Sequence, residues 1–488
     1  MDQGTSRETN PLLAPWMGPF EAPPFDNVKP SHFAEAFEAA LTSAQAEAAA
    51  IAANPEPPSF ENTIEALERS GDDLTRVSAV FFNLASADTN EELQALEREI
   101  APRLARHHSE IYLNDVLFQR IAALHARSAE LGLYAEQARV LDRYYTLFVR
   151  NGGGLPEATK ARLAEINELL ATLGTNFGQN VLADEKDYML VLSSKEDLAG
   201  LPASLVSAAA RTAADRGLQG SHGVTLSRSS IEPFLQFSTR RDLREKAFRA
   251  WALRGETGGV TDNRAIASEM VRLRAERARL LGHESFAHFR LADTMAKTPQ
   301  EALGLLQSVW APALNQALRE EDALQAIAAD EGGNFKVAPW DWRFYAEKRR
   351  KASYDLDEAE IKPYLQLDKM IEAAFFTANR LFGLSFTERK DIPLYHSDAR
   401  CWAVAGRDGQ EISLFLGDYF ARPSKRSGAW MSSFREQSKL DGDVRPIVVN
   451  VLNFAKAAEG EACLLSFDDA RTLFHEFGHA LHGMLSDV

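Results

Sequence analysis

Residues 467–488 read FDDARTLFHEFGHALHGMLSDV and contain an H-E-x-x-H motif formed by His475, Glu476 and His479. On an α-helix, side chains four positions apart lie one above the other on the same side. Two imidazoles at this spacing can bind one metal ion, and the glutamate between them is placed to act on a water molecule there. The motif therefore predicts a metal site on a helix. Zinc suits both histidine nitrogens and hydrolytic chemistry.

The residues around the motif are typical of an amphipathic helix. Ser466 is suited to the N-cap position, and Asp469 three residues later completes a capping box. At about 100° per residue, one group of apolar side chains falls within an arc of about 120°, and three histidines lie roughly opposite. The apolar group is Leu473, Phe474, Phe477, Leu481, Met484 and Leu485, and the histidines are His475, His479 and His482.

Chance is a minor explanation for the motif. With 11 His and 70 Asp and Glu in 488 residues, about 0.04 matches are expected at random. His482 is an unsuitable third ligand, because it lies roughly 10 Å along the helix axis from His475. A catalytic zinc takes three protein ligands. We expect the third either from an earlier segment that folds back or from residues that this chain does not include.

Composition predicts a soluble protein of the cytoplasm. Apolar residues make up 45% and charged residues 25% of the chain, and the net charge is −16. This charge argues against nucleic acid and anionic membrane surfaces as partners. The first 20 residues lack the pattern of a secretory signal, and no apolar stretch is long enough to span a bilayer. The two cysteines, Cys401 and Cys463, are expected to be reduced thiols, and a nucleophilic role lacks any local signature.

Hydrophobic periodicity predicts that most of the chain is helical. The expected helices cover residues 31–53, 60–86, 91–126, 129–150, 156–185, 203–216, 241–254, 263–281, 299–330, 341–353 and 365–381. Short strands are expected at 188–192 and 223–226. His283 and His288 are five positions apart, so they would not share a helix face, and we expect a structural role for them.

A small sheet is expected immediately before the metal helix. Residues 401–404 and 412–416 flank a Gly-Arg-Asp-Gly turn at 406–409, which favours a β-hairpin, and 447–454 is a nearly continuous apolar run. An edge strand of such a sheet can bind an extended peptide through main-chain hydrogen bonds. Ordinary packing of the sheet against the helix is an equally good explanation.

Several longer stretches resemble one family. They are TLFHEFGHALHGML (472–485), DYFARPSKRSGAWM (418–431), RPIVVNVLNF (445–454), LYHSDARCWAV (394–404) and WDWRFYAEKRR (340–350), with looser fits at 12–37 and 54–68. These stretches are similar to the thimet-oligopeptidase family of zinc metallopeptidases, and most closely to its bacterial peptidyl-dipeptidase branch.

The resemblance implies a mainly α, multi-helical zincin-type metallopeptidase, with a two-lobed shell around a deep channel. Residues 1–233 would form an N-terminal helical region. Residues 234–488 would form the N-terminal part of the catalytic domain, ending just after the H-E-x-x-H helix. The third zinc ligand in the family is a glutamate on a later helix, and the tyrosine and histidine that stabilise the intermediate also follow later. The chain is therefore expected to be a fragment that binds zinc weakly and has little or no activity of its own.

The resemblance also implies specific roles. His475 and His479 would bind one Zn²⁺, Glu476 would be the general base, and the strand from Val449 to Phe454 would align the peptide backbone. Val449, Asn450 and Asn453 are the expected substrate-binding residues. The expected activity is release of C-terminal dipeptides from short unfolded peptides by a monomer. Cleavage inside short peptides, and peptide binding without catalysis, are the alternatives.

Overall fold

The computed structural model describes residues 10–355, 358–457 and 460–488, which form two compact units. The first unit contains the described residues up to Ala85, with Thr89–Gln179 and Asn263–Leu303. The second contains Ser86–Asp88, Asn180–Asp262 and Gly304–Val488. Each unit draws on residues from both sides of position 233, and the expected division there stays a prediction.

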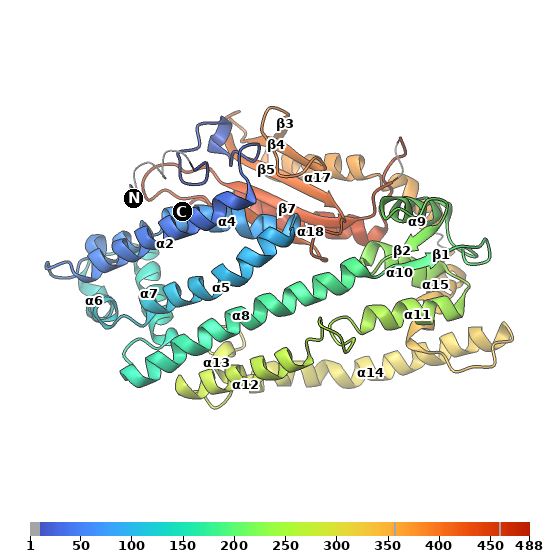
Figure 1. Cartoon of the computed structure of the whole chain (residues 1–488), viewed down its shortest axis with the longest axis horizontal. Coiled ribbons are helices and arrows are strands. Elements are labelled where there is room, and N and C mark those ends of the chain that lie inside the picture. Colours follow the sequence, from blue (N-terminus) through green and yellow to red (C-terminus); the bar gives the residue numbers. More distant parts are fainter. Residues whose placement is uncertain (1–9, 356–357, 458–459) are drawn as a thin grey trace. The chain divides into compact units, whose positions relative to one another are not determined.

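The first unit consists of helices (Figure 1). Its α-helices are α2 (Pro30–Ala52), α3 (Ala66–Glu68), α4 (Asp72–Ala87), α5 (Glu91–Tyr112), α6 (Asp115–Ala126), α7 (Ala135–Asn151), α12 (Arg264–Leu280) and α13 (Phe286–Leu291), with most of α8 (Glu157–Asp187). Short helices η1 (Pro19–Glu21), η2 (Phe60–Glu65) and η3 (Ser128–Glu130) lie between them. One core of this unit joins η2, α6 and α7 through side chains such as Ile64, Ile121 and Phe148.

Two of the predicted long helices are broken in the structure. Residues 60–86 divide at Gly71, whose φ of +80° suits glycine, and residues 91–126 divide at Asn114. The Asn114 side chain accepts hydrogen bonds from the backbone N–H groups of Val116 and Leu117, so it caps a new helix. These local contacts end one helix and begin the next, although the helical pattern of apolar residues continues through the sequence. The prediction of one helix in each range was wrong, although the helical content was right.

The second unit contains further helices and both sheets of the described chain. Its helices are α9 (Ala203–Asp215), α10 (Arg228–Phe237), α11 (Arg241–Ala252), most of α14 (Pro299–Asp330), α15 (Pro339–Tyr354), α16 (Glu358–Ile361), η4 (Lys362–Tyr364), α17 (Leu367–Phe382) and α18 (Phe467–Met484). A small sheet pairs β1 (Leu190–Leu192) with β2 (His222–Val224), which confirms the two predicted short strands.

A five-stranded sheet lies at the centre of the second unit. Its strands are β3 (Ser385–Glu388), β4 (Ala399–Ala405), β5 (Glu411–Phe420), β6 (Trp430–Arg435) and β7 (Ile447–Phe454), in the order β3-β4-β5-β7-β6. The predicted hairpin is confirmed, because β4 and β5 pair antiparallel around a turn in which Gly409 has a φ of +81°. The predicted strand 447–454 is also confirmed. The sequence analysis missed β3 and β6.

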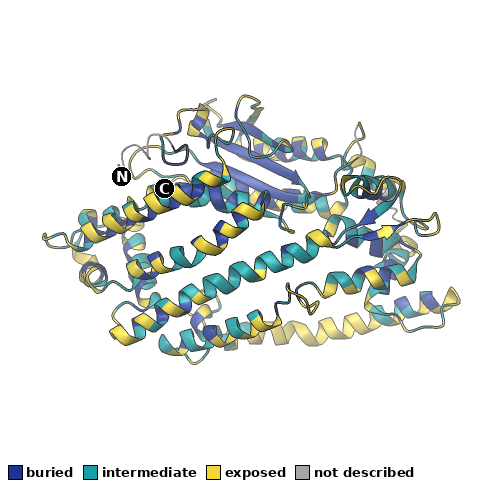
Figure 2. Ribbon diagram, in the orientation of Figure 1, coloured by how far each residue is buried: buried dark blue, intermediate teal, exposed yellow. Residues whose placement is uncertain are grey.

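Helices α17 and α18 cover one face of this sheet. Side chains of β4, β5 and β7 form a common core with the apolar faces of both helices. Phe477 of α18 lies at the middle of this core, with ring centroids 5.5 Å from Phe415, 5.8 Å from Phe375 and 5.8 Å from Phe386. Figure 2 shows the central strands in dark blue, as buried residues. This packing fixes the helix that carries the H-E-x-x-H motif against a rigid sheet.

Candidate active site

The helix α18 begins as its sequence predicts. Ser466 is the N-cap: its hydroxyl accepts a hydrogen bond from the Asp469 backbone N–H at 3.0 Å, and the Asp469 carboxylate accepts one from the Ser466 backbone N–H at 3.0 Å. Burial raises the pKa of Asp469, although Ser466 stabilises its carboxylate. The predicted capping box is confirmed, and it fixes where the helix begins.

The two faces of α18 differ as predicted. Leu473, Phe477, Ala480 and Met484 are buried against the sheet, whereas His475, His479 and His482 are exposed. Phe474 and Leu485, which the sequence placed on the apolar side, are 37% and 38% exposed. The apolar stripe is therefore narrower than predicted. Packing against the flat sheet needs only the side chains that point directly at it.

His475 and His479 lie side by side on the exposed face. Their Nε2 atoms are 3.2 Å apart, and their ring planes are inclined at 84° with centroids 4.8 Å apart. Both rings line a cavity of about 860 Å³. The helix alone brings these nitrogens together, since both residues belong to α18.

Glu476 lines the same cavity as the two imidazoles. It is 6% exposed, in contrast to its histidine neighbours. A carboxylate at the edge of a cavity, next to two imidazoles, is suited to accepting a proton from a water molecule. The arrangement offers two nitrogen donors for a metal and one proton acceptor. The assigned roles of these three residues stay predictions.

His482 lines the cavity one turn beyond His479. Its backbone carbonyl accepts a hydrogen bond from the Ser486 hydroxyl at 2.9 Å, near the end of α18. Among residues 10–355, 358–457 and 460–488, no three His, Cys, Asp or Glu side chains are grouped as metal ligands. The described chain therefore brings together the two histidines of the motif and no third ligand.

The edge of the sheet beside this cavity is β6, not β7. Strand β7 is paired with β5 on one side and with β6 on the other, and Val449 and Asn450 are buried within it. The Asn453 side chain donates hydrogen bonds to the carbonyls of Arg426 and Gly428. When a strand is paired on both sides, its main-chain N–H and C=O groups already form hydrogen bonds with the neighbouring strands. The expectation that β7 aligns a peptide therefore stays a prediction, and among the described residues the strand at this edge of the sheet is β6.

Strand β6 borders the cavity. Its residues from Trp430 to Ser433 line the cavity together with the motif histidines, and in the described chain it pairs with β7 alone. It lies close to α18 at Gly483, where a Cβ atom would lie 2.6 Å from Met431 Cε and 3.3 Å from Val448 Cγ2. The sequence WMSSFR has no clear alternation, which is why the strand was missed.

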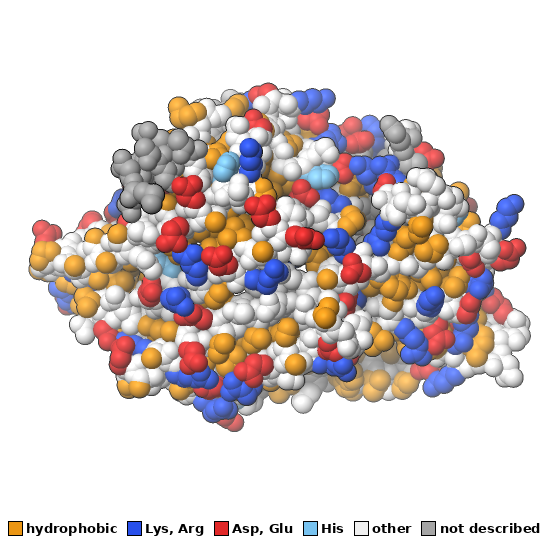
Figure 3. Space-filling model, in the orientation of Figure 1, with side chains coloured by type: hydrophobic (Ala, Val, Ile, Leu, Met, Phe, Trp, Pro, Cys, Tyr) orange, Lys and Arg blue, Asp and Glu red, His pale blue; other side chains and the backbone are white. Residues whose placement is uncertain are grey.

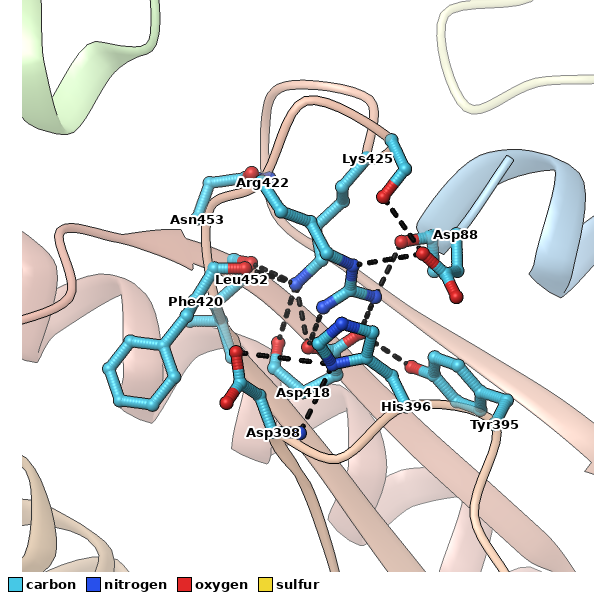
Figure 4. Close-up of polar contacts among 12 residues, drawn as sticks. Asp88, Tyr395, His396, Asp398, Asp418, Phe420, Arg422, Lys425, Leu452 and Asn453 are labelled. Carbon is cyan, nitrogen blue, oxygen red and sulfur yellow. Dashed lines mark hydrogen bonds and ion pairs between the residues drawn. The ribbon is translucent and has the colours of Figure 1, made fainter. Parts of the chain in front are cut away.

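A buried charge cluster holds the loop between β5 and β6 (Figure 4). The Lys425 ammonium lies 2.7 Å from Asp418 Oδ1 and donates to the carbonyls of Phe420 and Leu452 at 2.6 and 2.9 Å. Arg422 pairs with both oxygens of Asp418, at 2.9 and 2.6 Å. Ser424 and Arg422 also contact Asp88, at 2.8 and 3.5 Å. The cluster therefore fixes the chain that leads into β6.

The pKa values in this cluster follow from burial and pairing. Burial acts to raise the pKa of Asp418, but Arg422 and Lys425 outweigh it, so the pKa is lowered overall. Burial lowers the pKa of Lys425 to about 8, against the opposite effect of Asp418. Asp418, Arg422 and Lys425 lie within the stretch 418–431, whose sequence does not indicate a role for them. Their spacing of four and seven positions resembles a helix face, and only the fold shows a strand end and a loop.

The two cysteines have the properties of structural thiols. Burial raises the pKa of Cys401 to about 12 and that of Cys463 to about 11. Both thiols are therefore protonated at neutral pH, and a protonated thiol is a poor nucleophile. This agrees with the expectation that neither cysteine is catalytic.

None of the helices in the described part of the chain has the length and apolar character that a membrane span needs.

Comparison with known proteins places the chain in one family. A model of peptidase family M3 matches residues 234–488. The chain is 43% identical over 478 residues to dipeptidyl carboxypeptidase of Escherichia coli, a match that covers 98% of this chain and 70% of that protein. It is 31% identical over 486 residues to oligopeptidase A of the same organism, covering 98% and 71%.

A more distant relative gives the same result. The chain is 24% identical over 448 residues to saccharolysin of Saccharomyces cerevisiae, covering 88% of this chain and 62% of that protein. The mainly helical fold with a small sheet agrees with the predicted fold class, and the family identified from sequence motifs is confirmed. The chain belongs to peptidase family M3, a family of metallopeptidases.

Proposed function

We propose that this protein is a zinc-dependent peptidyl-dipeptidase, which releases dipeptides from the C-termini of short peptides. The observation that carries the proposal is the pair of imidazole Nε2 atoms, 3.2 Å apart, on the exposed side of α18. The identity of 43% to dipeptidyl carboxypeptidase supports the dipeptide product. His475 and His479 would hold the metal, and Glu476 would act as the general base.

The histidine pair fits zinc. Two Zn–N bonds of about 2.0–2.1 Å at a tetrahedral angle place their nitrogens roughly 3.3 Å apart. The observed separation of 3.2 Å is close to this value. Both donors are imidazole nitrogens, which are among the usual protein ligands of zinc. Binding would therefore require little movement of either ring.

The chain's own residues divide the chemistry between them. When bound, zinc supplies Lewis-acid polarisation of the scissile carbonyl and lowers the pKa of water. Glu476 accepts a proton from the attacking water and passes it to the leaving amine nitrogen. The imidazoles stay in place because α18 is capped by Ser466 and packed through Phe477.

The substrate lies along β6 in this proposal. An extended peptide adds to the free edge of the sheet by main-chain hydrogen bonds, which are nearly independent of its side chains. The cavity of about 860 Å³ contains both this edge and the motif residues. A peptide bonded to β6 would thereby pass in front of His475 and His479. Short unfolded peptides are the class of substrate that can adopt this extended form.

The protein's other partners are proposed from charge and composition. Figure 3 shows Lys and Arg side chains interspersed with Asp and Glu on the face drawn. With a net charge of −16, this pattern argues against nucleic acid and anionic membrane surfaces as partners, and we propose a monomer that acts on short peptides in the cytoplasm. Sedimentation of the purified protein would test the monomer.

Peptides with free and amidated C-termini test the proposed product. A peptidyl-dipeptidase must recognise the free carboxylate, so amidation should reduce kcat/KM strongly and dipeptides should be the product. Cleavage inside short peptides is the second candidate, supported by the identity of 31% to oligopeptidase A. In that case amidated and free peptides would be cleaved at similar rates. Tight binding of both peptides without cleavage would identify a peptide-binding protein instead.

A further inference from the structure

The second unit contains another cavity, which shares no lining residue with the cavity beside α18. Its volume is about 320 Å³. Its walls come from the end of α8, from α9, from the start of α10 and from the loops around residues 396–398, 421–427 and 453–456. Strand β7 connects the two sites, because Val448 lines the first cavity and Asn453 lines the second.

Positive side chains predominate in this second cavity, which we call the basic cavity. Three acidic side chains line it, namely Glu185, Asp215 and Asp398. The basic side chains that line it are Lys186, Arg211, Arg216, Arg422, Lys425 and Lys456. The excess is unusual in a protein whose net charge is −16. A wall of this kind is suited to a negatively charged ligand.

Some of these cations are already neutralised. Lys425 and Arg422 are paired with Asp418, and Lys456 is paired with Asp398. Figure 4 shows these contacts around Asp418 and the position of Asp398 beside His396. A ligand would therefore gain little from these three side chains. The charges available for binding are on the opposite wall, at the end of α9.

Arg216 is the main candidate for contact with a ligand. One of its Nη atoms donates to the Tyr188 carbonyl at 3.1 Å, and no carboxylate among the described residues lies within ion-pair distance of it. Burial lowers its pKa, with only Asp187 acting against this effect. A partly buried guanidinium with no carboxylate in direct contact is energetically unfavourable. An anion in the cavity would remove this cost.

Arg211 adds a second guanidinium to the same wall. It donates to the Ala457 carbonyl at 2.9 Å, and its nearest carboxylate, Asp215, is 3.9 Å away. Neither the hydrogen bond to Ala457 nor the contact with Asp215 has the bidentate geometry in which arginine binds oxyanions most strongly. Arg211 and Arg216 are five positions apart at the end of one helix, and both line the basic cavity.

The start of α10 supplies hydrogen-bond donors on the facing wall. Its N-cap residue, Ser227, makes no side-chain hydrogen bond to the helix. Its hydroxyl lies instead 3.1 Å from Thr225 Oγ1, and the Ser230 hydroxyl accepts from the Thr225 backbone N–H. Ser229 also lines the cavity. The N-terminus of a helix has free N–H groups and a partial positive charge, and both favour an anion.

We propose that the basic cavity binds a small oxyanion with at least two negative charges, of the phosphate or polycarboxylate class. Arg211 and Arg216 would contact it from one wall, and Ser229 and the N–H groups of α10 from the other. The proposal does not depend on the peptidase activity, because it uses no residue of the first cavity. The ligand would be an effector rather than a substrate.

Isothermal titration calorimetry tests the proposal with two probes, inorganic phosphate and citrate, each against sodium chloride of equal ionic strength. We expect saturable binding of at least one probe and none of chloride. Arg216→Gln should weaken binding by about tenfold or more, since it removes a charged bidentate donor. Arg319→Gln is the matched control, because Arg319 is exposed, bonds the Gln316 side chain and lies outside the cavity.

Two further variants test the site without removing an arginine from it. Ser229→Asp places a negative charge in the cavity without removing a buried cation, so it should also abolish binding even if Arg216→Gln folds poorly. His479→Ala should leave binding unchanged, which separates the basic cavity from the histidine pair. The proposal is overturned if neither probe binds, if Ser229→Asp binds normally, or if His479→Ala abolishes the signal.

Discussion

The Nε2 atoms of His475 and His479 lie 3.2 Å apart, on the exposed side of a helix whose other side is buried. This separation matches that of two nitrogens bound to one tetrahedral zinc, roughly 3.3 Å. The pair does not depend on contacts between distant segments, because one helical turn separates the residues. What depends on the rest of the fold is the cavity around them.

Removing either imidazole should prevent stable zinc binding. His475→Ala and His479→Ala should each weaken zinc affinity by more than roughly 100-fold, because each removes a direct ligand. Zinc content after dialysis against a defined free zinc concentration measures the effect. His482→Ala is the matched control, since His482 is on the same face and lines the same cavity. Equal zinc loss in all three variants would contradict the assignment of the two ligands.

Glu476→Gln should retain zinc and lose turnover. The amide has the same shape as the carboxylate but cannot accept the proton, so kcat should fall by about 10²–10⁴-fold. Zinc content and the affinity for a short peptide should stay close to those of the unmodified protein. Peptide hydrolysis followed by mass spectrometry measures the rate. A variant with full activity would show that another group accepts the proton.

The free edge of β6 predicts that substrate main-chain groups matter more than side chains. A peptide with one N-methylated backbone amide near the scissile bond should lose one hydrogen bond to the edge, worth about 0.5–1.5 kcal/mol. The expected result is a kcat/KM reduced by roughly 2–12-fold. Methylation of an amide several residues away provides the control. Equal values for both peptides would argue against pairing with β6.

Asp418 should be essential for stability. Asp418→Asn leaves Lys425 buried without its counter-charge and Arg422 with Asp88 alone, and the expected loss is about 3–5 kcal/mol in the free energy of unfolding. Lys425→Met should cost less, because Arg422 continues to neutralise Asp418. Urea denaturation at neutral pH measures both values. Asp391→Asn, at an exposed carboxylate paired with Arg389, is the control and should change stability little.

The Asp418 carboxylate also predicts how the free energy of unfolding depends on pH. The pKa of Asp418 is lowered in the folded protein below its ordinary value of 3.8. The unfolded chain therefore binds a proton at this group more readily, and the free energy of unfolding falls as pH decreases below about 3.8. Asp418→Asn should lack this part of the acid dependence. Urea midpoints between about pH 2 and 5 measure it, and parallel profiles for both proteins would contradict the pairing.

Much of the site could be predicted from local sequence. The capping pair Ser466 and Asp469, the apolar positions of α18 and the spacing of His475 and His479 all act within one helix. The hairpin of β4 and β5 was predictable because its glycine turn is also local. The long helices 60–86 and 91–126 were predicted as continuous because capping by Asn114 interrupts the chain without interrupting its periodicity.

Other parts could not be predicted, because they depend on pairing between distant segments. Strand β6 is partly exposed, so its six residues have neither alternation nor a continuous apolar run. The sequence predicted a strand at 447–454 but not that β5 and β6 pair with it on its two sides. Nothing local to a strand states whether it lies at the edge of a sheet or inside it.

The sequence by itself determined the chemistry available to this protein, since the helical repeat alone brings the two imidazoles and the carboxylate to one place. Only the tertiary structure decided which strand is free to bind a peptide and which charges are buried together. Lys425 bonds the carbonyl of Leu452, 27 positions away, and Asp418 owes its lowered pKa to its contacts with Lys425 and Arg422 in the folded chain. Such contacts arise from the packing of the whole sheet, and no short stretch of residues contains them.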